Sequence, residues 1–205
     1  MTEDRTENDN FIYGNYYDKY GSKNPAARIL TDNFIKNVKV ILKPLDYSNM
    51  LDIGCGEGYI TNEIASLKKS RVTGIDLGDE PLKKARSMYG DIEFVKCSAY
   101  ELPFEDSNFD LVTTIEILEH LDTPEKALEE IKRVAKKWII FSVPDEPLWR
   151  ILNVMSLRYL KDLGNTPGHV NHWTPKGFRN LIKKYFRVLK IVKPLPWTII
   201  LAEKL

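Results

Sequence analysis

Short apolar segments alternate with amphipathic segments through most of the chain. Five apolar runs have the length of strands: 50–53, 72–75, 92–97, 111–115 and 138–143. In the segments around them, apolar residues recur at the helical period: 30–42, 61–67, 81–88 and 124–137. Strands that alternate with helices are typical of a parallel sheet with helices on both faces, in which ligands bind beyond the carboxyl ends of the strands. We therefore predict an α/β fold with its site at that edge.

The C-terminal third departs from this alternation. Residues 146–168 interrupt it between the fifth strand and the next helix, at 175–185, and we interpret them as a lid. Residues 187–192 and 198–202 are rich in β-forming side chains, and the link 193–197 is too short for a parallel crossover. These two segments predict an antiparallel hairpin, which completes a mostly parallel sheet of seven strands.

The composition is that of one domain. At 205 residues with 43% hydrophobic content, the chain can bury one substantial core. Residues 1–10 are polar and acidic, so we expect a disordered tail and then a single domain over 11–205. No apolar run approaches the length that spans a bilayer, and Cys55 and Cys97 lack metal-ligand spacing. We expect a soluble cytoplasmic protein.

The charge balance argues against one class of partner. The chain has 30 basic and 29 acidic side chains, so it lacks the global positive field that draws proteins onto nucleic acid. These counts are still compatible with a local basic patch. We expect a small-molecule acceptor rather than a large RNA, and the sequence does not fix the oligomeric state.

A glycine-rich turn, Gly54-x-Gly56-x-Gly58, follows the first predicted strand. Alone it is a weak signal, because several nucleotide-like ligands bind such turns. A dinucleotide site places its third glycine one position later, where this chain has Tyr59, and the acidic Glu57 would oppose a pyrophosphate. S-adenosylmethionine carries a sulfonium, an ammonium and a carboxylate but no phosphate. The side chains around the turn therefore favour this cofactor.

Asp76 ends the second predicted strand, 22 residues after Gly54. A carboxylate at about this separation accepts hydrogen bonds from ribose hydroxyls. Leu77, next to it, is placed to cover one face of an adenine. The alternative interpretation is an Asp that only caps a strand-to-helix turn.

Five motifs together resemble, in order and spacing, the class I S-adenosylmethionine-dependent methyltransferases of the small-molecule type (methyltransferase type 11 and ubiquinone-biosynthesis-like proteins). The motifs lie at 51–58, 74–76, 101–104, 109–112 and 119–120. The resemblance implies a Rossmann-like fold. With Leu77, the candidate cofactor-binding residues are Asp52, Gly54, Gly56, Gly58, Asp76, Ser98, Ala99 and Glu116. The family usually has Asp where this chain has Ser98, so we expect weaker selectivity for adenine.

The candidate catalytic groups follow the fourth predicted strand. Glu116, Glu119 and His120 stand at i, i+3 and i+4, so a helical turn would direct all three toward the methyl end of the cofactor. His120 is the natural general base, because the ordinary pKa of imidazole lies near neutrality. The alternative is a surface turn whose charges pair with nearby lysines. Together with His169, described next, Glu119 and His120 form the predicted catalytic set.

A second histidine cluster lies at 168–175. Two carboxylates and two imidazoles form the mixed oxygen and nitrogen ligand set that suits magnesium, manganese or iron. The arrangement also resembles two metal-using branches of the superfamily, the small-RNA terminal 2′-O-methyltransferases and the ubiquinone-pathway O-methyltransferases. That resemblance implies the metal ligands Glu116, Glu119, His120 and His169. We favour base catalysis by His120 without metal, with Mg or Mn as the additional hypothesis.

The side chains of the predicted lid suggest an apolar or amphipathic acceptor. The lid's large apolar and aromatic residues are Trp149, Met155, Leu157, Tyr159 and Leu160. The basic residues among them, which either meet an anionic group of the acceptor or are simply solvated, are Arg150, Arg158 and Lys161. A tyrosine cluster near the N-terminus either closes over the cofactor or packs a helix: Tyr13, Tyr16, Tyr17 and Tyr20.

Methylation of oxygen is the favoured reaction, although the sequence does not separate it firmly from N- or C-methylation. Two other classes of function stay open. One is a non-catalytic module that binds S-adenosylmethionine for regulation, against which the intact Glu and His residues argue. The other is a nicotinamide-dependent oxidoreductase, which Glu57 and Tyr59 disfavour.

Overall fold

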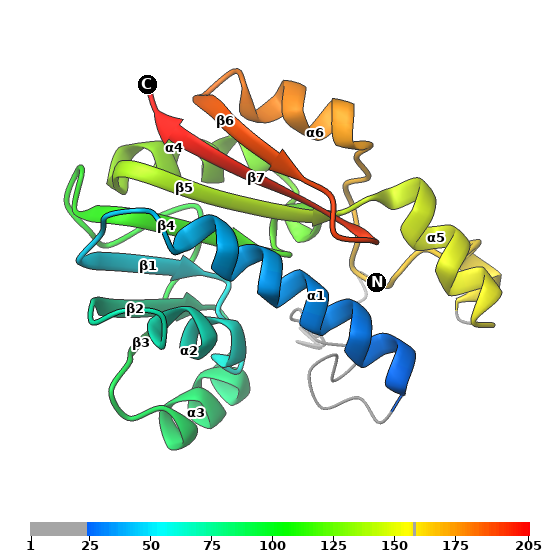
Figure 1. The fold of residues 1–205 in the computed structure, drawn as a ribbon, viewed down its shortest axis with the longest axis horizontal. Helices are drawn as coiled ribbons and strands as arrows, with labels where there is room; N and C mark the ends of the chain where they lie inside the picture. Colours follow the sequence, from blue (N-terminus) through cyan, green and yellow to red (C-terminus); the bar gives the residue numbers. More distant parts are fainter. Residues whose placement is uncertain (1–23, 158) are drawn as a thin grey trace, which may run out of the picture.

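Seven strands form one mixed sheet in the order β3-β2-β1-β4-β5-β7-β6 (Figure 1). In the computed structural model, which describes residues 24–157 and 159–205, the strands are β1 (Asn49–Ile53), β2 (Arg71–Asp76), β3 (Glu93–Lys96), β4 (Phe109–Ile115), β5 (Ala135–Pro144), β6 (Phe186–Val192) and β7 (Trp197–Lys204). β1 to β5 pair in parallel, and β7 lies antiparallel between β5 and β6. The predicted seven-stranded sheet with its C-terminal antiparallel hairpin is confirmed. The predicted tail 1–10 and the tyrosine cluster lie outside the described residues.

Helices cover both faces of this sheet. They are α1 (Pro25–Leu42), α2 (Tyr59–Ala65), α3 (Asp79–Met88), α4 (Pro124–Val134), α5 (Glu146–Met155) and α6 (Pro175–Ile182), with short 3-10 turns η1 (Leu118–His120) and η2 (Leu160–Asp162). One core contains Phe34 and Val38 of α1, and the other contains Leu128 of α4 and Phe178 of α6. The prediction of helices on both faces is therefore confirmed.

The predicted end of the helix at 124–137 is wrong. α4 ends at Val134, and Ala135 is already the first residue of β5. Ile131, Val134 and Ala135 are all fully buried, so the apolar stripe of the helix runs without a break into the strand. Because the hydrophobic pattern has no gap, it does not mark the boundary. The helix predicted at 175–185 also ends early, at Ile182, and residues 183–185 form a turn before β6.

Parallel pairing brings the loops that follow β1, β2, β4 and β5 to one edge of the sheet. Asp52 of β1 stands opposite Gly74 of β2 and Thr113 of β4, and Thr114 stands opposite Phe141 of β5. These strands end on the side of the molecule where α5 begins (Figure 1). The glycine turn follows β1, Asp76 ends β2, and the segment 116–120 follows β4, whereas Ser98 and Ala99 follow β3 and His169 follows η2.

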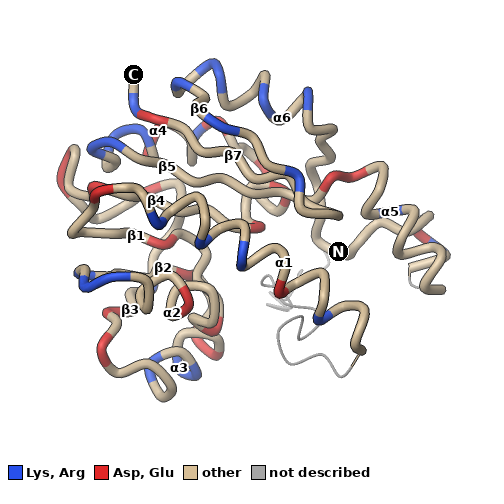
Figure 2. Tube along the Cα trace, in the orientation of Figure 1, with Lys and Arg blue, Asp and Glu red and all other residues tan. Residues whose placement is uncertain are grey.

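The nearly neutral total charge conceals a local basic surface. Between residues 175 and 193 the chain has seven basic residues and no acidic one, and all seven side chains are exposed. Figure 2 shows their concentration along α6 and β6. In the described part of the chain, no helix has both the length and the apolar character needed to cross a membrane.

Candidate active site at the carboxyl edge

The glycine turn is fixed to the end of β2 by backbone hydrogen bonds. Gly54 and Cys55 both donate their N–H groups to the Ile75 carbonyl, at 2.8 and 2.9 Å, and Gly58 donates to Cys55 at 2.9 Å. Gly54, Gly56 and Gly58 have φ values of +75°, +53° and +80°. Side chains other than glycine are strained in this left-handed region. The turn therefore needs glycine at all three positions.

The three glycines face different surroundings. A Cβ added to Gly54 would lie 2.6 Å from Ile117 Cδ1, and one added to Gly58 would lie 2.8 Å from the Phe94 ring. A Cβ added to Gly56 would meet no protein atom within 4 Å. Packing therefore demands glycine at the outer two positions. At Gly56 the backbone faces open space, which is where a ligand can approach the turn.

Asp76 holds the same turn from the end of β2. One carboxylate oxygen accepts the Gly56 N–H at 2.9 Å, and the other accepts the Gly78 N–H at 2.8 Å. A carboxylate oxygen has two lone pairs, so each can accept a further hydrogen bond from a hydroxyl. Leu77 beside it is 42% exposed. The Asp76 carboxylate therefore caps the turn, and its oxygens can still accept the predicted hydrogen bonds from ribose hydroxyls.

The turn's N–H groups are largely used inside the protein. Those of Gly54, Cys55, Gly56 and Gly58 all donate to protein oxygens. A pyrophosphate site needs such donors to point at the ligand. The hydrogen bonding therefore adds a second argument, beside the acidic side chains, against a phosphate ligand at this turn.

Asp52 lies beneath the turn and is only 3% exposed. Its carboxylate accepts hydrogen bonds from the hydroxyls of Thr61 and Thr113, each at 2.6 Å. Burial raises the pKa of Asp52 to about 6, although the two threonine hydrogen bonds favour the charged form and the nearby Asp76 disfavours it. These contacts join β1, α2 and β4 below the predicted cofactor site. Direct binding of the cofactor by Asp52 stays a prediction.

Ser98 and Ala99 follow β3 and lie next to the same edge. The Cys97 N–H donates to the Asp76 carbonyl at 3.1 Å, which holds this segment against the end of β2. The Ser98 hydroxyl accepts the Tyr100 N–H at 3.2 Å, and Ala99 is buried. The predicted adenine-binding pair is thus anchored near Asp76 and Leu77.

The expected helical turn from Glu116 to His120 is wrong. Glu116 has a left-handed backbone with φ of +59°, and its N–H donates to the Ser142 carbonyl of β5 at 3.1 Å. Only Leu118–His120 forms a turn, the 3-10 helix η1. Because β5 still holds the backbone at Glu116, the i, i+3 and i+4 relation does not direct these three side chains to one face.

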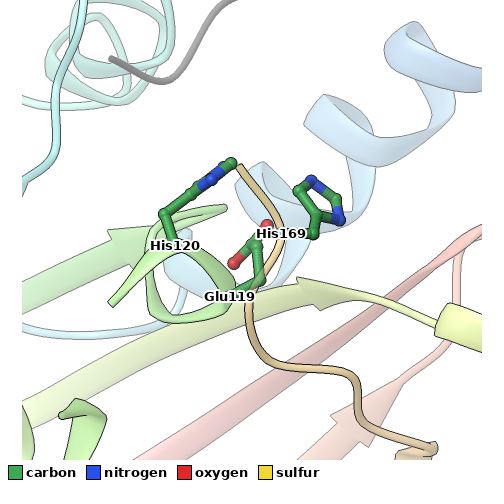
Figure 3. A group of neighbouring side chains, drawn as sticks. All are labelled: Glu119, His120 and His169. Atoms are coloured by element: carbon green, nitrogen blue, oxygen red, sulfur yellow. The ribbon is translucent and has the colours of Figure 1, made fainter. Parts of the chain in front are cut away.

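Glu119, His120 and His169 nevertheless come together. One possible ligand atom from each lies within 4.8 Å of the others, and Glu116 is not in this group. Figure 3 shows the Glu119 carboxylate between the two imidazoles, whose ring centroids are 4.9 Å apart. Glu119 and His169 are buried, whereas His120 is half-buried. Three of the four predicted metal ligands therefore share one place in this structure.

The loop that carries His169 is joined to η1 by hydrogen bonds. Val170 and Asn171 donate their N–H groups to the Glu119 carbonyl at 2.9 and 3.0 Å, and the Asn171 amide donates to the Leu121 carbonyl at 2.6 Å. His120 Nδ1 lies 2.9 Å from the Gly168 carbonyl. A carbonyl only accepts, so Nδ1 of His120 carries the proton and Nε2 carries the lone pair. This is the form that acts as a base or a metal ligand.

One acidic residue of this site has no signal in the sequence. Glu146, the first residue of α5, lies with its Oε1 2.7 Å from His169 Nδ1, and both side chains are buried. The residues are 23 positions apart in segments that were predicted separately, as a lid and as a histidine cluster. Only the packing of α5 against the 168–172 loop brings them into contact.

The predicted lid is α5 and η2, held together by polar contacts. The Trp149 indole N–H donates to the Thr166 hydroxyl at 2.8 Å, and the Asn153 amide donates to the Gly164 carbonyl at 2.9 Å. Arg158 lies outside the described residues. The large apolar side chains exposed in this segment are Ile151, Val154, Met155, Leu157, Leu160 and Leu163. The contacts of this segment with His169 come from Glu146 and Trp149 at its start.

Comparisons with known proteins find that this chain is similar to methyltransferases. The family described as "Methyltransferase domain" matches residues 51–141. The O-methyltransferase cnsE of Penicillium expansum is 33% identical over 62% of this chain and 48% of its own length. Norajmaline N-methyltransferase of Rauvolfia serpentina is 36% identical over 56% of this chain and 41% of its own length. The chain thus spans about half the length of the curated relatives it matches.

The fold is shared with solved structures as well. Magnesium protoporphyrin IX methyltransferase from Synechocystis, solved with bound SAH, superposes with a TM-score of 0.68 over 90% of each chain at 18% identity. Together with the strand order, this confirms the Rossmann-like fold that the motifs imply.

The buried Asp52 predicts a specific dependence of stability on pH. Between its ordinary pKa of 3.8 and about 6, the folded chain keeps a proton that the unfolded chain has lost. The free energy of unfolding therefore falls as pH rises through this window, by about 3 kcal/mol in total at about 1.4 kcal/mol per unit, and the loss is complete above it. Asp52→Asn, which stays neutral, should lack this component.

Urea denaturation at intervals from pH 4 to pH 7 measures this difference. The stability of Asp52→Asn relative to the unmodified chain should rise across the window. Asp91→Asn, at an exposed position, is the control for loss of one carboxylate. Parallel curves for Asp52→Asn and the unmodified chain would show that the buried carboxyl does not titrate as described.

Proposed function

We propose that this chain, whose residues 51–141 match the family described as "Methyltransferase domain", transfers a methyl group from S-adenosylmethionine to a hydroxyl of a small apolar or amphipathic acceptor. The observation that carries this proposal is the edge of the sheet, where the open face of Gly56, the Asp76 carboxylate and the His120 imidazole follow neighbouring strands. Bound there, S-adenosylmethionine supplies an electrophilic methyl group on sulfur.

The residues of the turn fit this cofactor. The space at Gly56 admits a ligand close to the backbone, and the carboxylate of Asp76 can accept from ribose hydroxyls. Leu77 offers an exposed apolar side chain for the adenine, with Ser98 and Ala99 on the neighbouring segment. In this proposal Gly54, Gly58 and Asp52 act by holding the turn, whereas Glu116 lies at the methionine end.

His120 performs the chemistry that the protein must add. Methyl transfer is a displacement that mainly requires alignment, but a hydroxyl acceptor must also lose its proton. His120 Nε2 has the lone pair for this step, because Nδ1 donates to Gly168. Glu119, buried between the two histidines, stabilises the imidazolium that forms. The need for a base is the reason for favouring oxygen over the nitrogen acceptor of one relative.

The apolar acceptor is supported by the segment next to this base. Trp149 lies over His169, with ring centroids 6.4 Å apart. Beyond it, Met155, Leu157 and Leu163 are each more than 70% exposed. Soluble proteins rarely leave several neighbouring apolar side chains in water without a ligand or partner. An apolar portion of the acceptor would cover these side chains.

A divalent ion is the second element of the proposal. Glu119, His120 and His169 would hold Mg or Mn through one carboxylate oxygen and two imidazole nitrogens, and both rings have Nδ1 hydrogen-bonded to protein, which leaves Nε2 as the ligand atom. An ion in this place would lower the pKa of the acceptor hydroxyl. Proton removal by His120 and binding of the hydroxyl by the ion are two alternative ways for the acceptor hydroxyl to lose its proton.

Gly56→Ala should separate folding from cofactor binding. The new methyl group meets no protein atom within 4 Å, so only the left-handed backbone opposes it, by about 1 to 2 kcal/mol of stability. In the binding site the methyl group would displace the ligand, and affinity for S-adenosylmethionine should fall by more than tenfold.

Calorimetry tests this with both S-adenosylmethionine and NAD. Gly90→Ala, where an added Cβ also meets nothing within 4 Å, should bind as the unmodified chain does. Tight binding of NAD by the unmodified chain would favour the oxidoreductase alternative and contradict the assignment of the cofactor.

His120→Ala should lower turnover without loosening the cofactor. Removal of a general base costs roughly 100-fold or more in kcat. The S-adenosylmethionine dissociation constant should stay within about twofold, because the cofactor contacts lie on β1, β2 and β3. The assay is S-adenosylhomocysteine formation with a panel of amphipathic phenols and alcohols. Turnover retained in the variant would remove His120 from the reaction, and no turnover by the unmodified chain with any acceptor would favour a regulatory module.

The metal part has its own test. After treatment with EDTA, the unmodified chain should bind Mn²⁺ in calorimetry and gain activity with Mn²⁺ or Mg²⁺. Glu119→Gln should weaken Mn²⁺ binding by about tenfold or more, because it removes the anionic ligand. If neither ion binds nor stimulates, the metal hypothesis is wrong and base catalysis by His120 is left.

A further inference from the structure

Glu146 is a buried carboxylate whose purpose the proposed reaction does not yet explain. Its side chain is 4% exposed, and its Oε1 lies 2.7 Å from Nδ1 of His169, whose side chain is 2% exposed. Its Oε2 lies 3.5 Å from Nδ1 of His172, a partly exposed residue. A buried carboxylate is costly unless hydrogen bonds compensate it, and the 2.7 Å contact with His169 supplies one such bond, to Oε1.

We propose that Glu146 is a positioning residue that fixes the tautomer and the direction of the His169 ring. An ionised carboxylate only accepts hydrogen bonds, so Nδ1 of His169 must carry the proton. The lone pair is then on Nε2, the nitrogen that does not face Glu146. The His169 and His120 rings form a T-shaped pair, with centroids 4.9 Å apart and 81° between their planes. The expected effect of Glu146 on turnover rests on the proposed function, whereas its effect on the tautomer of His169 does not.

The surrounding backbone fixes Glu146 itself. Its N–H donates to the Trp173 carbonyl at 3.3 Å, and the Asp145 N–H donates to the Pro196 carbonyl at 2.8 Å. The start of α5 is therefore tied both to the histidine loop and to the β6–β7 turn. These contacts hold the Glu146 carboxylate at a defined place. Its hydrogen bond can therefore orient the His169 imidazole.

His120 and His169 are both held at Nδ1 by a protein oxygen, but the oxygen is of a different kind in each case. A backbone carbonyl, that of Gly168, holds Nδ1 of His120, whereas a carboxylate holds Nδ1 of His169. In the neutral form of each ring, Nδ1 then carries the proton and Nε2 the lone pair.

The test reads the tautomer directly. The chain has three histidines, so long-range ¹H–¹⁵N spectra of the uniformly labelled full chain contain only three imidazoles. At mildly alkaline pH without added metal, His169 should be a single tautomer with the proton on Nδ1. In Glu146→Gln, which keeps the side-chain volume, the amide can either accept from or donate to Nδ1, so a mixture or the opposite tautomer should appear. A His169 proton on Nε2 in the unmodified chain overturns the proposal without any variant.

The matched control is His172→Ala, which removes the other histidine near Glu146 and leaves the 2.7 Å contact in place. It should not change the tautomer of His169. With an acceptor that the unmodified chain methylates, Glu146→Gln should lower kcat by about 10- to 100-fold and leave the KM for S-adenosylmethionine unchanged. The control His172→Ala should keep the melting temperature of the unmodified chain. The same tautomer in Glu146→Gln as in the unmodified chain, or a kcat within twofold, contradicts the proposal. If the unmodified chain methylates nothing, the spectra still decide the role of Glu146.

Discussion

The parallel pairing of β1 with β2 on one side and β4 on the other is the constraint on which the site depends. It places the ends of these strands at one edge, where Ile75 accepts two N–H groups from the glycine turn and Asp76 accepts a third. Without that register the turn would lose most of its hydrogen-bond acceptors. The left-handed backbone of the three glycines would then lack the hydrogen bonds that hold it in place. The conformation of the predicted cofactor turn therefore depends on the sheet as well as on the glycines.

Hydrogen bonding inside the turn explains the kind of ligand that it suits. The N–H groups that a phosphate would require already donate to protein oxygens, and a carboxylate lies on each side of the sheet edge, Asp52 below and Asp76 at the rim. The buried one is stabilised by two threonine hydroxyls from α2 and β4. The acceptor that this turn offers to a ligand is Asp76, because both oxygens of the buried Asp52 already accept from threonine hydroxyls.

The predicted catalytic residues come from segments far apart in the chain. Hydrogen bonds to the Glu119 and Gly168 carbonyls join η1 to the loop of His169, and Glu146 at the start of α5 contacts His169 itself. Burial makes these contacts more specific, because a misplaced polar group in the interior has no water to compensate it. The loop at 168–171 is thus positioned by its own backbone, and its histidine by a carboxylate from another element.

The sequence by itself determined the order of strands and helices, the C-terminal hairpin, the cofactor turn and the acid after β2, because these follow from local periodicity and from residue types at fixed spacing. It also indicated His120 and His169 as partners, through motif resemblance. It did not determine the end of α4, because a buried helix stripe continues directly into a buried strand at Ala135. Nor did it determine the left-handed backbone of Glu116, which β5 holds, or the contact of Glu146 with His169. Those features depend on which distant segments pack together, and only the tertiary structure decides that.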